Sequence, residues 1–392
     1  MRQPLRILTL DVGTGTQDIL LFESDKTIEN CFQLIMPSPT VIMAERIKRA
    51  TSSGKQLVLT GCTMGGGPCA WAARDHAQAG FPTFATPNAA RTFDDDLAMV
   101  EQLGVRIVSE AEATRLVEQA NTIHLELKDF DATALITALR AFDIDPNVDA
   151  LAIAVFDHGA APPGISDRLF RFNHIAQTVR QRPKPAAFAY LRETLPANLT
   201  RLQAVAASAA DYQRLIGVEQ RTSQAPVQAA DILPLLLMDT GAAAAVGTLD
   251  DPRVQREREA VLVNIGNFHT LGFYLVDGQI AGLFEHHTGL LHQEKLEGLL
   301  EKLVAGTLTN EEVFDDSGHG ALILGEKYKQ GGGFPFLAVT GPRREMLRGS
   351  VLQPYEAVPH GDMMLAGCFG LLRALADQLP DFAPAINQAL ER

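Results

Sequence analysis

Two short segments of the sequence place a carboxylate or an amide next to glycine in the same order. LTLDVGTGTQDILLF contains Asp11, and VLVNIGNFHTLGFYL contains Asn264 at a constant offset of 253 residues. Each segment has an apolar strand, a turn with glycine at the same place and a second apolar strand, which is typical of a β-hairpin. Four pairs correspond at this offset: Asp11 and Asn264, Gly13 and Gly266, Thr14 and Asn267, Thr16 and His269. Either two ordinary hairpins look alike, or the chain has two duplicated halves.

The first turn contains residues suited to holding phosphate groups. Gly13, Thr14, Gly15 and Thr16 would present backbone N–H groups and hydroxyls in a concave array that fits phosphate oxygens. Asp11, at the end of the preceding strand, could hold Mg²⁺ against those phosphates, directly or through water. Two such hairpins facing one cleft could therefore bind a triphosphate from both sides.

These segments resemble the motifs of the superfamily that joins acetate and sugar kinases, heat-shock chaperones and actin (ASKHA). DVGTGTQDILLF resembles its first phosphate motif, NIGNFHTLGFYLVDG its second, and FLAVTGPRREML its adenosine motif. The resemblance implies an α/β fold of two duplicated actin-like ATPase (ribonuclease H-like) domains with a nucleotide cleft between them. It also implies ATP and Mg²⁺ as cofactors, with Asp11 as the Mg²⁺ ligand. The nucleotide-binding residues would be Gly13, Thr14, Gly15, Thr16, Asn264, Gly266, Asn267, His269, Gly341 and Pro342.

A further segment, MDTGAAAAVGTL, is similar to the Gly-Asp-x-x-Ala-x-x-x-Gly segment of carbohydrate kinases. In those enzymes the aspartate is the catalytic base, so the resemblance gives this role to Asp239. Asp239 could instead cap the alanine-rich helix that follows it.

The full-length pattern (DVGTGTQD, DHG, EHHTG, GHG, TGPRR and HGDMM) most closely resembles an uncharacterised branch of this superfamily. That branch has no known function and is often labelled as related to pyruvate formate-lyase activating enzyme. Such activases need a CxxxCxxC motif, and the four cysteines of this chain do not have that spacing. The second hairpin departs from the superfamily pattern, because Asn264 replaces an acidic residue and Asn267, Phe268 and His269 replace small ones.

Histidines and carboxylates beside glycine form a second set of candidate residues. They are Asp157 and His158 after an apolar strand, Glu285, His286 and His287 after the second hairpin, and His319 in a turn-rich loop. Side chains at the ends of buried strands emerge where α/β proteins bind ligands, so these residues could form a polar substrate pocket beside the γ-phosphate. They could also bind a metal through two or three histidines and a carboxylate, or cap turns and helices. A glycine-rich loop, 61–68, could line the same pocket.

Strand and helix signals alternate in the elements that must position these residues. Strands at 56–60, 83–86, 105–108 and 150–156 alternate with helices at 69–79, 94–103 and 132–142, which favours an α/β domain with a buried sheet. The polar segment 219–228 is the best linker candidate. We therefore predict one domain over 1–230, with its extra length in a helical insertion around 167–230, and a second domain over 231–392.

Composition limits the classes of function. The chain has 392 residues, of which 46% are hydrophobic, and a formal net charge of −13. This length allows two or three domains, and the acidic balance argues against non-specific binding of nucleic acid or of an anionic membrane. The N-terminal segment lacks the apolar region of a signal peptide, and no apolar stretch is long enough to span a bilayer. A cytoplasmic location follows as an expectation.

The leading hypothesis is ATP- and Mg²⁺-dependent phosphoryl transfer to a small polar metabolite, with Asp11 organising Mg²⁺ and Asp239 accepting a proton. A second hypothesis is an ATP-driven conformational switch that acts on an unidentified protein partner. A third is a metal-dependent enzyme that uses the histidines. A homodimer is compatible with all three.

Overall fold

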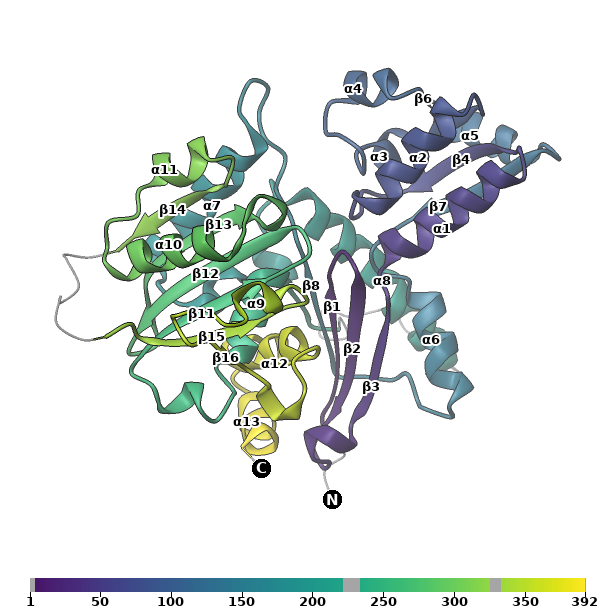
Figure 1. The fold of residues 1–392 in the computed structure, drawn as a ribbon. Coiled ribbons are helices and arrows are strands. Elements are labelled where there is room, and N and C mark those ends of the chain that lie inside the picture. The colour runs from purple at the N-terminus through teal and green to yellow at the C-terminus, as the bar shows by residue number, and fades with distance from the viewer. Residues whose placement is uncertain (1–3, 221–232, 325–332, 392) are drawn as a thin grey trace.

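Three β-sheets make up the framework of the computed structural model, which describes residues 4–220, 233–324 and 333–391 (Figure 1). The first sheet consists, in spatial order, of β3 (Phe32–Pro37), β2 (Thr16–Glu23), β1 (Arg6–Val12), β8 (Ala150–Val155), β10 (Leu235–Asp239) and β9 (Ala189–Leu191). The second consists of β14 (Gly320–Ile323), β13 (Gln279–His287), β12 (His269–Val276), β11 (Glu259–Ile265), β15 (Phe336–Thr340) and β16 (Tyr355–Glu356).

The same pairing pattern occurs in both sheets. β1 pairs antiparallel with β2 and parallel with β8, and β10 follows parallel to β8. β11 likewise pairs antiparallel with β12 and parallel with β15, and β16 follows parallel to β15. Three antiparallel strands followed by two parallel ones form the ribonuclease H-like arrangement. Its repetition confirms the predicted class, an α/β fold with two duplicated actin-like ATPase domains.

The third sheet is entirely parallel and forms a lobe beside the first domain (Figure 1). Its strands, in spatial order, are β6 (Val105–Ile107), β5 (Thr83–Ala85), β4 (Gln56–Gly61) and β7 (Thr122–Leu127). This lobe is inserted between β3 and β8, whereas the extra length of the first domain was predicted around 167–230. Buried parallel strands have the same apolar pattern in either sheet, so periodicity alone could not assign them to separate sheets.

Helices cover these sheets and connect their strands. They are α1 (Pro39–Ser52), α2 (Pro68–Gln78), α3 (Pro87–Ala90), α4 (Leu97–Gln102), α5 (Glu110–Val117), α6 (Ala132–Ala141), α7 (Asp167–Gln181), α8 (Thr200–Gln220), α9 (Thr240–Thr248), α10 (Gln293–Val304), α11 (Asn310–Asp315), α12 (Ala366–Gln378) and α13 (Ala383–Leu390). Among the described residues, no helix combines the length and apolarity needed to cross a bilayer.

The first sheet continues past the domain boundary predicted at residue 230. β10 hydrogen-bonds to β8 as a strand of the first sheet, and the second sheet begins only at β11. Most of the predicted linker, 219–228, lies outside the described residues. Strand pairing therefore moves the start of the second half to the segment between α9 and β11.

Helices α9 and α12 join the two halves through a contact between their backbones. A Cβ atom added to Gly247 would lie 1.7 Å from the carbonyl oxygen of Ala366, and one added to Gly370 would lie 1.9 Å from that of Ala243. The contact is therefore nearly symmetric, and only glycine fits at its two central positions. The largest buried core contains residues of both helices and of both main sheets.

We expect Gly370→Ala to destabilise the protein by about 3 kcal/mol, because the new methyl group forces the two helix backbones apart. Gly298→Ala is the matched control, since a Cβ atom added to Gly298 in α10 meets no atom within 4 Å. The control should gain up to about 1 kcal/mol, as glycine is a poor residue in a helix interior. Denaturant unfolding of both variants measures the difference. Equal stabilities would contradict the tight contact.

Candidate functional site

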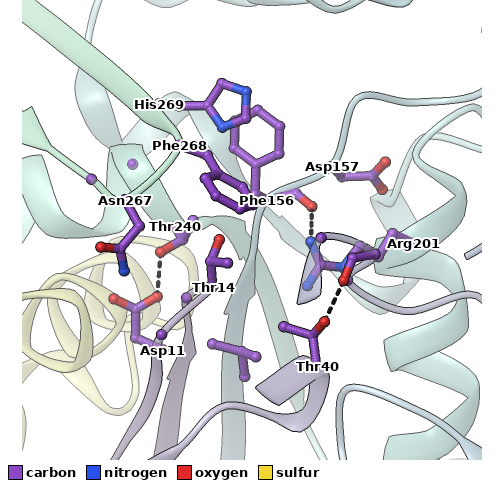
Figure 2. A pocket seen from close by; sticks show the side chains of 18 of the residues that line it. Asp11, Thr14, Thr40, Phe156, Asp157, Arg201, Thr240, Asn267, Phe268 and His269 are labelled. Atoms are coloured by element: carbon purple, nitrogen blue, oxygen red, sulfur yellow. Dashed lines mark hydrogen bonds between the residues drawn. The ribbon is translucent and has the colours of Figure 1, made fainter. Parts of the chain in front are cut away.

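A cleft of about 500 Å³ lies where the two hairpin turns approach each other (Figure 2). The first turn joins β1 to β2, and the second joins β11 to β12. They come so close that a Cβ atom added to Gly15 would lie 2.8 Å from Nδ2 of Asn267. The duplicated hairpins of the sequence therefore face each other across one cleft.

Both turns have the same internal hydrogen bond. The N–H of Gly13 donates to the carbonyl of Thr16, and the N–H of Gly266 donates to the carbonyl of His269, each at 2.9 Å. Among the described residues, the N–H groups of the two central positions in each turn have no acceptor: Thr14, Gly15, Asn267 and Phe268. Four N–H groups are thus available to an anion in the cleft.

Two carboxylates from the first hairpin also line the cleft. Asp11 and Asp18 are cross-strand partners in the pairing of β1 with β2. Asp11 Oδ1 accepts a hydrogen bond from the Thr240 hydroxyl at 2.5 Å, and buried Asp18 Oδ1 has no partner. Burial raises the pKa of Asp11 to about 7, although the Thr240 hydrogen bond opposes this. Burial and the Asp11 charge raise the pKa of Asp18 to about 8.

Asp18 and Thr240 are absent from the residues predicted from sequence. The hairpin register could have identified Asp18, because the bond between Gly13 and Thr16 fixes the strand pairing and places Asp18 opposite Asp11. Thr240 had no comparable signal, since its contact with Asp11 joins residues 229 positions apart.

The predicted adenosine motif lies on the second-domain side of the cleft. Thr340, Gly341 and Pro342 line it at the end of β15. Gly341 has a φ of +95°, and a Cβ atom there would lie 2.5 Å from the carbonyl oxygen of Ile265. Glycine is therefore required both by its backbone conformation and by the close approach to β11.

The inserted lobe supplies the opposite wall. Residues 63–67 of the glycine-rich loop line the cleft. A Cβ atom added to Gly65 would lie 2.7 Å from Nη2 of Arg201, whose guanidinium also pairs with Asp129. Trp71 at the start of α2 contacts Phe268 of the second turn, with ring centroids 5.6 Å apart. The lobe thus touches the second hairpin directly.

Asp239 does not line this cleft. Its Oδ1 accepts hydrogen bonds from the N–H groups of Gly241 and Ala242, which makes it the N-cap of α9. Its Oδ2 lies 2.9 Å from Nη1 of Arg171, and the side chain is only 13% exposed. Arg171 also forms a bidentate ion pair with Glu285, at 2.8 and 2.7 Å. Both carboxylates therefore neutralise one buried guanidinium.

The structure brings three of the candidate histidines together. One ring nitrogen each of His158, His269 and His319 lies within 4.8 Å of the others. The ring centroid of His287 lies 4.8 Å from that of His319. His269, predicted to contact nucleotide, thus belongs to the histidine group as well as to the second turn.

His286 and Asp157 lie outside this group. His286 Nε2 lies 3.1 Å from Asp316 Oδ2. His286 is separated from the other histidines because 279–287 forms a strand. Successive side chains of a strand point to opposite faces, so Glu285 and His287 share one face and His286 lies on the other. Asp157 lines the cleft, but its two oxygens accept the N–H groups of Gly159 and Leu202.

We expect stability to fall as pH rises, because the pKa values of Asp11 and Asp18 lie above their unfolded value of 3.8. Their contribution is fully present below about pH 4 and is lost as pH rises through 7 to 8. Without Mg²⁺, Asp18→Asn should stabilise the protein by at least about 2 kcal/mol more at pH 8.5 than at pH 5. Mg²⁺ should stabilise the wild type more at pH 8.5 than at pH 5. Thermal unfolding at both pH values, with exposed Asp381→Asn as control, checks this; identical pH profiles for the two variants would contradict it.

Comparison with known proteins places the chain in a family. Among solved structures it is similar to EutJ, an ethanolamine utilization protein from Carboxydothermus hydrogenoformans (14% identity, 95% of this chain and 90% of that chain, TM-score 0.33). It is also similar to a carbohydrate kinase from Novosphingobium aromaticivorans (9%, 97% and 88%, TM-score 0.23). A third is a ROK family transcriptional regulator, homologue of the E. coli MLC protein (11%, 70% of this chain, TM-score 0.25), and the chain covers 38% of that regulator.

No curated protein matches the sequence. A family model matches residues 64–346, which is most of the chain. The protein therefore belongs to the family described as "Putative pyruvate format-lyase activating enzyme (DUF1786)".

Proposed function

We propose that the protein binds ATP with Mg²⁺ between its two hairpin turns and transfers the terminal phosphoryl group to a small polar acceptor. The observation that carries the proposal is the pair of equivalent turns, whose four unpaired N–H groups flank one cleft. A cleft of about 500 Å³ is also of the size that small-molecule sites have. The phosphates would lie between the turns, and the adenosine would lie toward Gly341 and Pro342.

The carboxylates fit Mg²⁺. Asp11 and Asp18 offer oxygen ligands on adjacent strands, and buried Asp18 Oδ1 lacks a hydrogen-bond partner. Oxygen ligands are those that Mg²⁺ prefers, usually with one or two carboxylates and phosphate oxygens. The ion would supply positive charge between these acids and the phosphates. The protein would position the reactants and stabilise the charge on the phosphoryl group, which is most of what phosphoryl transfer requires.

The catalytic-base role of Asp239 stays a prediction. A base needs a free lone pair within reach of the acceptor, whereas the oxygens of Asp239 face the start of α9 and Arg171. For Asp239 to accept a proton, its ion pair with Arg171 would have to open. An acceptor bound near His158 and His269 would lie in the same cleft as the second turn.

A nucleotide-driven conformational switch is the second candidate. The contact of Trp71 with Phe268 links the inserted lobe to the second hairpin, so a ligand that moves this hairpin would move the lobe. The engaged oxygens of Asp239 and the amide at position 264 also favour binding or slow hydrolysis over transfer to a metabolite.

Intrinsic fluorescence offers a direct test, because Trp71 is the single tryptophan of the chain, is half-exposed and contacts the second turn. We expect ATP with Mg²⁺ to give a saturable change in fluorescence. Asp11→Asn should weaken binding at least about tenfold, since it removes a charged Mg²⁺ ligand. Asp381→Asn, an exposed substitution of the same kind, should bind as the wild type does.

A titration in which ATP, ADP and GTP all leave the fluorescence and the unfolding temperature unchanged would refute the nucleotide site. Turnover separates the two candidates. ATP consumption that depends on a small polar metabolite supports phosphoryl transfer, whereas consumption stimulated only by another protein supports the switch.

A further inference from the structure

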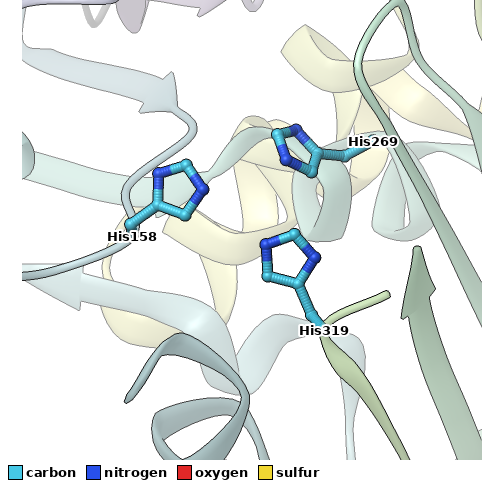
Figure 3. A group of neighbouring side chains, drawn as sticks. All are labelled: His158, His269 and His319. Atoms are coloured by element: carbon cyan, nitrogen blue, oxygen red, sulfur yellow. The ribbon is translucent and has the colours of Figure 1, made fainter. Parts of the chain in front are cut away.

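Three imidazoles from three segments of the chain converge beside the nucleotide cleft (Figure 3). His158 follows β8 in the first domain, while His269 begins β12 and His319 precedes β14 in the second. One ring nitrogen of each lies within 4.8 Å of a ring nitrogen of both others. No other group of three His, Cys, Asp or Glu side chains with ligand atoms this close occurs in the described parts of the chain.

Three of the six ring nitrogens lack the partners that buried polar atoms need. His319 is fully buried, and neither of its ring nitrogens has a hydrogen-bond partner; Nε2 of His269 has none either. A buried polar atom without a partner costs roughly 1–3 kcal/mol. The rings are nevertheless held by packing, since His269 stacks on Phe156 with centroids 3.9 Å apart and His158 stacks on His319 at 5.7 Å.

The charges near the rings are compatible with a bound cation. A neutral imidazole offers one ring nitrogen as a metal ligand. The nearby guanidinium of Arg171 is offset by two carboxylates, Asp239 and Glu285. These three charged groups together carry one negative charge, which does not oppose a cation.

We propose that His158, His269 and His319 bind one divalent transition-metal ion, of the class of Zn²⁺ or Fe²⁺, at a coordination site open to the cleft. Imidazole suits these ions, whereas Mg²⁺ prefers the oxygens of Asp11 and Asp18. The site is therefore separate from the proposed Mg²⁺ site. Metal binding itself does not depend on the proposed function.

The burial of the three residues shows which side of the site faces the cleft. His158 and His269 line the cleft, whereas His319 closes the site from the protein interior. Three protein ligands with a further position open is the pattern of catalytic zinc sites. A water molecule, or an oxygen or nitrogen atom of a substrate, would take the open position beside the second turn.

The carboxylate of Glu285 lies near His319, the most buried of the three proposed ligands. Oε2 of Glu285 lies 3.9 Å from Nδ1 of His319, which is too far for a hydrogen bond in the metal-free protein. If metal binding closed this gap, the carboxylate would orient the imidazole as such partners do in other metal sites. Zn–N distances of 2.0–2.1 Å put the nitrogens of a tetrahedral site about 3.4 Å apart. Binding would thus draw the three rings together by up to about 1.4 Å and fix the position of the second turn.

Metal binding to the full-length protein, stripped with a chelator and kept free of nucleotide, tests the proposal. We expect one Co²⁺ per chain, with a visible absorption band that Zn²⁺ abolishes and a hundredfold excess of Mg²⁺ leaves unchanged. His158→Asn and His319→Asn should each weaken Co²⁺ binding at least about a hundredfold. His124→Asn, on an exposed position of β7, should bind as the wild type does.

Absence of stoichiometric binding by the wild type, or equal binding by all variants, would overturn the site. X-ray absorption of the Zn²⁺-loaded wild type gives an answer even where a variant fails to fold. Three imidazole nitrogens around the metal support the proposal, and one or none overturns it. The ATP titration is independent, so the histidine site can fail while the nucleotide proposal stands, and the reverse.

Discussion

The backbone contact between α9 and α12 fixes how the two halves of the protein meet. Gly247 and Gly370 let the helices approach until the carbonyl of one fills the space a side chain would need on the other. Both helices begin at the cleft, where Thr240, Gly241, Ala366 and Gly367 line it. The two hairpins precede these helices in the same order within each half, so the helix contact brings the turns together. Larger residues at the two glycines would separate the two hairpin turns as well as loosen the core.

This arrangement also explains how an acidic chain could bind an anion. The net charge of −13 repels nucleotides at long range, and the acids of the cleft are poorly solvated. Attraction must therefore be local. It would come from the N–H groups of the two turns, from the positive ends of the helix dipoles at the starts of α9 and α12, and from a cation at the proposed site between Asp11 and Asp18. The raised pKa values of Asp11 and Asp18 have a related cause, since burial and the neighbouring carboxylates disfavour their charged forms. A proton or a bound cation would relieve this charge.

Local sequence patterns predicted correctly those elements that neighbouring residues determine. The two hairpins and their 253-residue offset were predicted, because apolar strands and turn glycines mark such elements directly. The inserted lobe was not predicted as a separate unit, because its buried strands have no pattern of their own. β13 was not predicted from the sequence. The alternation along this strand, which separates His286 from Glu285 and His287, was therefore not foreseen. Arg171 and Thr240 act through partners distant in sequence, which one sequence does not reveal.

If the proposed site is correct, both turns bind the same phosphate chain. A crystal structure with Mg²⁺ and a non-hydrolysable ATP analogue tests it most directly. We expect phosphate oxygens within hydrogen-bond distance of N–H groups in both the Gly13–Thr16 and Gly266–His269 turns, with Mg²⁺ near Asp11 and Asp18. Phosphates bound elsewhere, or held by one turn only, would contradict it.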